Sequence, residues 1–219
     1  MIKNDYVIRL EEKADYYKTE YLVRESFWNV YRPGCSEHYV LKCLRDDADF
    51  VPQLDFVMEK DGQIIGQIVF VKAAITKDGG GVLPVLTFGP ICIEKSYQKK
   101  GYGKILLDYA LDKATEMGFG AVFIEGNINF YRHCGLTYAR EYGISYHGLP
   151  DGADEPTDEE CVAAVLADGR LGAHFLYQII ILLFRHADPS GKRMRKISGN
   201  MRNLHKIYNF HAFPMFTLC

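Results

Sequence analysis

At one point of this chain a strand pattern gives way to a helix pattern, and that junction constrains the fold. Residues 91–114, ICIEKSYQKKGYGKILLDYALDKA, begin as an apolar run and end as an amphipathic helix, with QKKGYGK between them. A helix N-terminus carries unpaired backbone N–H groups and a partial positive charge, so it binds anions. Gly101 and Gly103 let the backbone approach a phosphate closely, and three lysines add charge. The junction therefore predicts a site for a diphosphate.

The glycine spacing differs from that of two well-known phosphate-binding motifs. A P-loop requires Gly-x4-Gly-Lys-Ser/Thr. A dinucleotide-binding fingerprint has three glycines and an acidic residue after a second parallel strand. QKKGYGK matches neither, which disfavours a nucleotide-phosphate binder. From the spacing alone, a glycine-rich turn with its lysines in solvent is an equal alternative.

The rest of the chain predicts a mixed α/β order with a largely antiparallel first half. Asp61-Gly62, between two strand-like runs, is the strongest short hairpin signal. Gly89-Pro90 interrupts an apolar strand, and a mid-strand proline lacks the N–H that a ladder needs, so we expect a bulge or a splaying of strands there. We predict strands over 6–10, 54–60, 63–72, 82–93, 121–124 and 136–146, and helices over 15–31, 36–44, from QKKGYGK to 117, and 127–134.

Two of the predicted helices have recognisable start signals. Asp15 is expected to cap the first helix, whose apolar stripe runs through Phe27 and Val30 to an end near Tyr31. Ser36 is expected to cap the second helix in the same way.

Net charge and cysteine spacing narrow the class of protein. A net charge of −2 gives no general attraction to nucleic acid or membranes. The six cysteines include no Cys-x-x-Cys pair, which argues against a zinc site and a disulfide framework, and Cys92 is expected to be a small buried hydrophobe. The N-terminus lacks the apolar segment of a signal peptide, and the apolar run at 174–184 is shorter than the about 20 residues that span a bilayer. We therefore expect a reduced, cytoplasmic protein that binds no metal and enters no membrane.

The C-terminal part differs in charge from the rest. Residues 1–168 carry 27 acidic and 18 basic side chains, whereas residues 169–219 carry 1 and 8. A capping box of Thr157 with Glu160 predicts a helix over 153–167, and the run at 174–184 is either a strand or a buried helix. The charge reversal marks either a divergent extension or a changed reading frame. RNA binding is disfavoured against packing on the body or on a second subunit, because the tail is rich in apolar residues.

Two motifs make the sequence resemble the GNAT superfamily of acyl-coenzyme A N-acyltransferases over about residues 5–150. QKKGYG at 98–103, after the strand 89–93, is similar to the loop that wraps the pyrophosphate of coenzyme A in that family. EGNINFYRHCGL at 125–136 is similar to the family's Tyr-x-x-x-Gly-Phe element, with Leu136 in place of the phenylalanine. The resemblance implies a mixed α/β (α+β) fold with a central, mostly antiparallel twisted sheet, flanked by helices and splayed between its fourth and fifth strands. It assigns residues 1–152 to the N-acyltransferase domain and leaves 153–219 as an atypical extension.

The resemblance also implies which residues contact the coenzyme. Backbone N–H groups at 91–93 are candidates for contacts with the thioester and the pantetheine arm, whereas Pro90 has no N–H to offer. The expected coenzyme-binding residues are Ile91, Cys92, Ile93, Gln98, Lys99, Lys100, Gly101, Tyr102, Gly103, Lys104 and Asn127.

Attack of an amine on a thioester needs placement, stabilisation of the oxyanion, removal of a proton from the amine and return of one to the thiolate. By the resemblance, Tyr131 is the general acid, and a pKa of about 10 keeps a tyrosine protonated at pH 7. A packing role is the alternative for this residue. Glu125 is the candidate base, since partial burial would raise its pKa toward a useful range. Glu94, His133 and a chain of waters are its rivals.

In the family the first two helices line the acceptor site. Trp28, Tyr31 and Arg32 fall off the main apolar stripe, and aromatic groups beside Arg and Glu suit a pocket, although these side chains could simply cover Phe27. The resemblance therefore implies an acetyl-CoA-dependent N-acetyltransferase that moves an acetyl group to a primary amine of a small molecule or peptide by direct attack. A homodimer is one arrangement for it. The alternative is a non-catalytic acyl-CoA-binding regulatory module that acts through its C-terminal extension.

Overall fold

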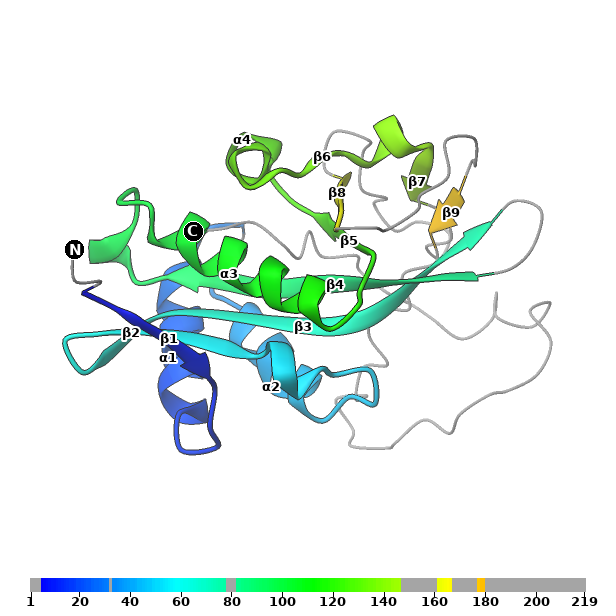
Figure 1. Cartoon of the computed structure of the whole chain (residues 1–219). Coiled ribbons are helices and arrows are strands. Elements are labelled where there is room, and N and C mark those ends of the chain that lie inside the picture. Colours follow the sequence, from blue (N-terminus) through cyan, green and yellow to red (C-terminus); the bar gives the residue numbers. More distant parts are fainter. Residues whose placement is uncertain (1–4, 32, 78–81, 147–160, 167–176, 180–219) are drawn as a thin grey trace.

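The computed structural model describes residues 5–31, 33–77, 82–146, 161–166 and 177–179 (Figure 1). The strands are β1 (Val7–Leu10), β2 (Phe56–Lys60), β3 (Gln63–Lys77), β4 (Val82–Ile93), β5 (Ala121–Glu125), β6 (Thr137–Tyr138), β7 (Ile144–Tyr146), β8 (Cys161–Val165) and β9 (Tyr177–Ile179). The α-helices are α1 (Tyr16–Phe27), α2 (Glu37–Arg45), α3 (Tyr102–Glu116) and α4 (Ile128–Tyr131).

The strands of the described residues form one mixed sheet between two layers of helices. Its order is β1-β2-β3-β4-β5-β8-β6, and β9 pairs with both β3 and β7. The pairs β4–β5 and β7–β9 are parallel and the other pairs are antiparallel. Helices α1 and α2 cover one face, and α3 lies on the other (Figure 1). The predicted fold class, a mostly antiparallel sheet flanked by helices, is confirmed.

Two apolar clusters fill the space between the sheet and its helices. Alternate residues of a strand face opposite sides of a sheet, so β3 and β4 contribute to both clusters. Phe70 and Phe88 pack with Leu107 in the cluster under α3, whereas Val69 and Cys92 belong to the cluster under α1 and α2. Cys92 is fully buried, as expected of a small hydrophobe.

The predicted hairpin and the predicted strand irregularity are both present. β2 and β3 pair antiparallel up to Lys60↔Gln63, and the connecting residues Asp61 and Gly62 have φ values of 50° and 76°. Positive φ at both central residues is what a two-residue type I′ hairpin loop requires. In the next pair of strands the register passes from Ile68↔Ile91 to Phe70↔Phe88, so two residues of β4, Gly89-Pro90, stand opposite one residue of β3. This is the β-bulge.

The first helix is shorter than predicted, and neither predicted cap forms. α1 ends at Phe27, because Asn29 takes a left-handed φ of 58° and closes a loop onto Gly34 through N···O contacts of 2.8 and 2.9 Å. Val30 is consequently exposed rather than part of the buried stripe. The Asp15 carboxylate accepts hydrogen bonds from Arg9 and the Glu12 N–H, so it caps no helix. Ser36 makes no side-chain cap either.

The C-terminal strands differ most from the prediction. The expected strand 136–146 is divided into β6 and β7 by a 3-10 turn at 139–142, which ends at Gly143 with φ 69°. The helix predicted over 153–167 is wrong for 161–165, which form β8 along the free edge of β5. The capping box lies outside the described residues. Within the run 174–184 the structure describes strand β9 and nothing else.

A buried ion-pair network fastens α1 and α2 to the sheet. The Arg45 guanidinium at the end of α2 contacts both oxygens of Glu11, at 2.7 and 3.0 Å, and its side chain is 3% exposed. It also donates to Glu20 and to the Thr19 hydroxyl of α1, each at 2.8 Å. Three chain segments therefore meet at one cation.

Candidate active site

The sheet opens into a wedge between β4 and β5. Within the described residues these strands pair at Leu86↔Val122 alone, and the bulge at Gly89-Pro90 follows three residues later in β4. The Glu94 N–H donates to Ile65 O of β3 at 2.7 Å. Because backbone groups of successive strand residues point to opposite sides, the peptide groups of Ile91 and Ile93 face the wedge and that of Cys92 faces β3. The expected splay between the fourth and fifth strands is confirmed.

The QKKGYGK turn lies at the C-terminal end of β4. Lys99 and Gly101 have left-handed φ values of 58° and 89°, on either side of Lys100. Gly101 is the N-cap of α3, where no side chain caps the helix and the first turn holds no acidic residue. A Cβ added at Gly101 would meet nothing within 4 Å. The turn thus presents an open helix N-terminus, flanked by lysines, and these features suit a diphosphate.

Side chains of the same turn hold it in place. Gln98 Nε2 donates to the Ile93 carbonyl oxygen at 2.9 Å, which ties the turn to the end of β4. The Tyr102 ring packs edge-on against the rings of Tyr6 and Tyr97, each at 6.0 Å between centroids. Lys104 pairs with Asp108 one turn further along α3. Lys99 and Lys100 are exposed.

A close approach of α3 to β3 fixes the start of the helix. Gly66 of β3 stands opposite Ile93 of β4, and a Cβ there would lie 2.7 Å from the Ile93 side chain and 3.2 Å from Leu106 of α3. Gly66 therefore allows α3 to pack directly on the end of β4. No local sequence pattern marks this glycine, because the atoms it makes room for are distant in the chain.

Tyr131 of α4 lies against β4 beside the bulge. Its side chain is fully buried, and its ring centroid is 5.8 Å from that of Phe88, the residue just before Gly89-Pro90. A second edge-on contact, at 5.1 Å, joins it to Phe130. α4 begins at Asn127, whose side chain accepts from the Asn129 N–H at 2.9 Å. The sequence-predicted acid therefore lies beside the strand whose peptide groups face the wedge.

The candidate bases occupy three different environments. Glu125 ends β5, where it stands opposite Cys161 of β8, and it is 7% exposed. Glu94 follows β4, and its carboxylate accepts from the Ser96 N–H at 3.2 Å and from the Ser96 hydroxyl. His133 is exposed on the 3-10 turn after α4. Glu125 is the most buried of the three.

The connection from α1 to α2 approaches β4 from the face opposite α3. Ser26 is fully buried at the end of α1, and its hydroxyl lies 3.5 Å from the Ile93 carbonyl oxygen. Trp28 is 47% exposed beside Arg24, and the half-exposed Tyr31 has its ring 6.3 Å from that of Phe27. Arg32, the third predicted acceptor contact, lies outside the described residues.

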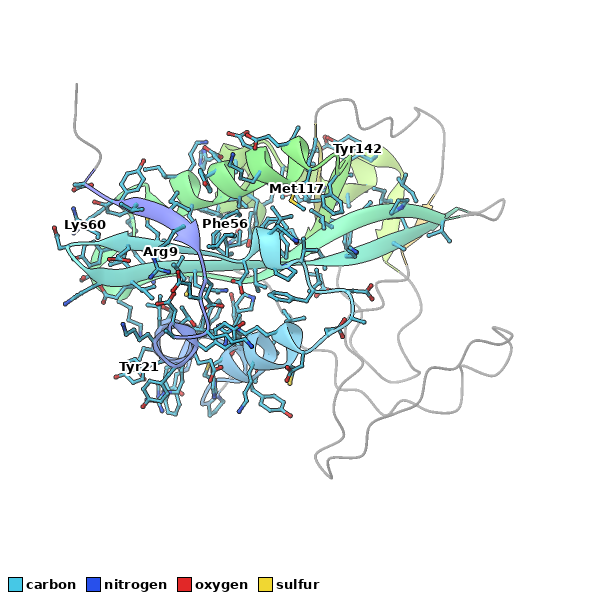
Figure 2. The ribbon with its side chains drawn as sticks, turned by 60° about the horizontal axis from the view of Figure 1, so that its bottom comes forward. Arg9, Tyr21, Phe56, Lys60, Met117 and Tyr142 are labelled. Atoms are coloured by element: carbon cyan, nitrogen blue, oxygen red, sulfur yellow. The ribbon has the colours of Figure 1, made fainter. Side chains whose placement is uncertain are left out.

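A pocket of about 590 Å³ opens between α1, the start of β3 and the end of β4. Ser26, Gln63 and Glu94 contribute to its wall, together with Tyr21 on the side of α1 that points away from the sheet (Figure 2). The pocket and the wedge therefore border the same end of β4.

Comparison of the sequence with models of protein families shows which family the chain belongs to. The model of the acetyltransferase (GNAT) family matches residues 21–136, which is more than half of the chain. The chain belongs to the GNAT acetyltransferase family.

Solved structures agree with the family assignment. A GNAT N-acetyltransferase, YhbS of Escherichia coli, solved in complex with CoA, is 25% identical, with a TM-score of 0.64 over 80% of this chain and 89% of that one. A GNAT acetyltransferase of Brucella melitensis in complex with acetyl-CoA is 23% identical, with a TM-score of 0.53 over 62% and 84% of the two chains. Ard1 of Thermoplasma volcanium, 16% identical with a TM-score of 0.51 over 74% and 98%, shares the fold. The comparison with curated proteins found no match.

Two structural roles in this GNAT protein were missed by sequence reasoning. The side-chain amide of Gln98 donates to Ile93 O, a role that the sequence did not suggest, and its contact with the coenzyme stays a prediction. Ser26 was not singled out, although it approaches the same oxygen from α1. Both depend on where Ile93 lies in space, and a linear motif does not record that position.

In the described part of the chain, no helix has the length and apolar composition to cross a membrane.

Proposed function

We propose that this GNAT protein transfers the acetyl group of acetyl-CoA to a primary amine of a small molecule or peptide by direct attack. The observation that carries this proposal is the open N-terminus of α3, with left-handed Lys99 and Gly101, placed at the end of the strand that borders the wedge. Acetyl-CoA supplies an activated acetyl group as a thioester. The diphosphate binds the backbone N–H groups of the turn and the nearby lysines.

The wedge orients the reacting groups. Backbone N–H groups of Ile91 and Ile93 hold the pantetheine arm and the thioester, since they point away from β3. The amine nitrogen forms a bond to the acetyl carbon as the carbon–sulfur bond breaks. Glu125 takes a proton from the amine, and Tyr131 gives one to the departing sulfur. Water then restores both side chains.

A calorimetric titration tests the coenzyme step first. Acetyl-CoA should bind with a Kd in about the micromolar range that specific cofactor sites show, and ATP should bind far more weakly. Release of thiol with an amine panel then tests transfer. Equal binding of ATP and acetyl-CoA would reject the coenzyme site. Acetyl-CoA binding without thiol release for any amine would reject the transferase and leave the regulatory module.

Gly101→Val should weaken acetyl-CoA binding at least about tenfold, because a left-handed φ costs a side-chain-bearing residue about 1–2 kcal/mol and the added atoms occupy the face that meets the phosphate. The fold should survive, since the new side chain meets open space. Titration calorimetry of the variant measures the change.

Gly118→Val is the matched control. Gly118 has φ 85° at the other end of α3 and equally open surroundings. It should lower the melting temperature as much as Gly101→Val does and leave coenzyme affinity unchanged. Similar affinities for both variants would show that the turn holds no phosphate.

A further inference from the structure

One carboxylate lies beside the lysines of the QKKGYGK turn. Asp108 pairs with Lys104 in the first turn of α3, and both side chains are about half exposed. Lys99 and Lys100 have no carboxylate within 4 Å among the residues that the structure describes. Of the three lysines of this turn, Lys104 alone is therefore held by an acidic side chain.

A second contact orients the Asp108 carboxylate. The thiol of Cys134, on the 3-10 turn after α4, donates a hydrogen bond to it. Burial, and then the nearby Asp108 charge, raises the pKa of this thiol to about 12, so it stays protonated and donates at neutral pH. Cys134 also packs against the apolar cluster under α3. The pair of Lys104 and Asp108 is therefore anchored to the body of the protein, unlike an isolated surface ion pair, which contributes little.

The charge of Asp108 opposes the binding of an anion at the start of α3. The first turn of the helix contains no acidic residue, so Asp108 is the acid of α3 nearest to its N-terminus. With a rise of about 1.5 Å per residue, about 10 Å of helix axis separates Asp108 from Gly101. At that distance a carboxylate repels a diphosphate through solvent. The same carboxylate also occupies an ammonium group that the diphosphate would otherwise use.

We propose that Asp108 is a positioning residue that competes with the coenzyme diphosphate for Lys104, and that it thereby weakens coenzyme binding and favours release of the product CoA. This inference rests on the proposed acetyl transfer and concerns the coenzyme site of that reaction. When the diphosphate binds, Lys104 exchanges the carboxylate for phosphate oxygens, and Asp108 keeps its hydrogen bond from Cys134. After transfer, Asp108 competes for Lys104 again and lowers the affinity for CoA.

Calorimetric titration of CoA into Asp108→Asn at low ionic strength tests the inference. The Kd should fall about threefold, because a negative charge near the diphosphate is removed and Lys104 is freed. A substitution that merely damages the site raises the Kd instead. The difference should shrink as salt is added, because screening limits the reach of a charge to about 8 Å at physiological ionic strength. Asp108→Glu should restore the wild-type Kd, since a glutamate four residues away also reaches Lys104.

Glu116→Gln is the matched control. Glu116 ends α3, pairs with Lys113 at 2.6 Å and lies about 20 Å along the axis from the start of the helix, so its loss should leave the CoA Kd unchanged. An unchanged Kd in Asp108→Asn overturns the inference. A higher Kd also overturns it, because the carboxylate would then present Lys104 to the diphosphate. Both results leave the proposed function standing if the wild type binds acetyl-CoA, whereas a wild type that binds no coenzyme rejects both.

Discussion

Tyr131→Phe is expected to lower kcat for acetyl transfer by about 10²- to 10⁴-fold, the range for loss of a positioned general acid or base, while acetyl-CoA affinity stays unchanged. The reason is chemical, because the substitution removes nothing but the hydroxyl that the proposed mechanism uses to protonate the departing sulfur. The ring is fully buried and keeps its edge-on contacts with Phe88 and Phe130. Steady-state thiol release measures kcat, and calorimetry measures the affinity.

Tyr109→Phe controls for loss of a tyrosine hydroxyl from the same apolar cluster. Tyr109 packs edge-on against Phe56 at 5.2 Å, on the β2 side of α3, and should be silent in the assay. A folding defect would appear in both variants as a lower melting temperature. Normal turnover by Tyr131→Phe would remove Tyr131 from the chemistry and leave it a packing residue.

Apart from the helix caps at Asp15 and Ser36, features that depend on a few neighbouring residues were predicted well from the sequence. The Asp61-Gly62 hairpin, the Gly89-Pro90 bulge and the start of α3 each follow from local backbone chemistry. A two-residue loop needs positive φ, proline cannot pair in a ladder, and glycine opens a helix N-terminus. The QKKGYGK turn and Tyr131 were likewise found through short local motifs.

Features that depend on distant partners were missed. Residues 161–165, CVAAV, follow an apparent capping box, yet they form β8 because the edge of β5 offers a full ladder from Ala121↔Val165 to Glu125↔Cys161. Tertiary pairing overrides weak helix propensity in so short a segment. Arg45 and Glu11 are 34 residues apart, so no periodicity connects them.

The free energy of unfolding is expected to fall as pH rises from 6 to 8, by about 1.4 kcal/mol per pH unit for one proton. Asp55, which precedes β2, is responsible. Burial, and then its hydrogen bond to Glu11, raises the pKa of this carboxyl to about 9. Asp55 is 3% exposed, and Gln67 Nε2 lies 3.4 Å from Asp55 Oδ1. The folded protein therefore holds a proton here at neutral pH.

Stability falls with rising pH because Asp55 has a higher pKa in the folded protein than in the unfolded chain. In the unfolded chain Asp55 has a pKa of about 3.9, so between about pH 4 and 9 folding takes up a proton. The stability that Asp55 contributes is fully present below the unfolded pKa and is lost as pH rises toward the folded one. The titratable and charged groups of this cluster come from α1, from the end of α2 and from the residues just after β1 and α2; they are Glu11, Glu20, Tyr16, Arg45 and Asp46. The thiols of Cys35 and Cys134, with pKa values raised by burial to about 11 and 12, do not titrate in this window.

Asp55→Asn should flatten this dependence and make the protein more stable than the wild type at pH 8, because asparagine stays neutral without taking up a proton. Urea unfolding at pH 6, 7 and 8 gives the slopes. Asp15→Asn is the opposite control: Arg9 lowers the pKa of Asp15, so the stability from this group is constant above pH 6 and is lost only in acid. That variant should be less stable by a similar amount at all three pH values and keep the wild-type slope. A wild-type slope that persists in Asp55→Asn would assign the proton to another group.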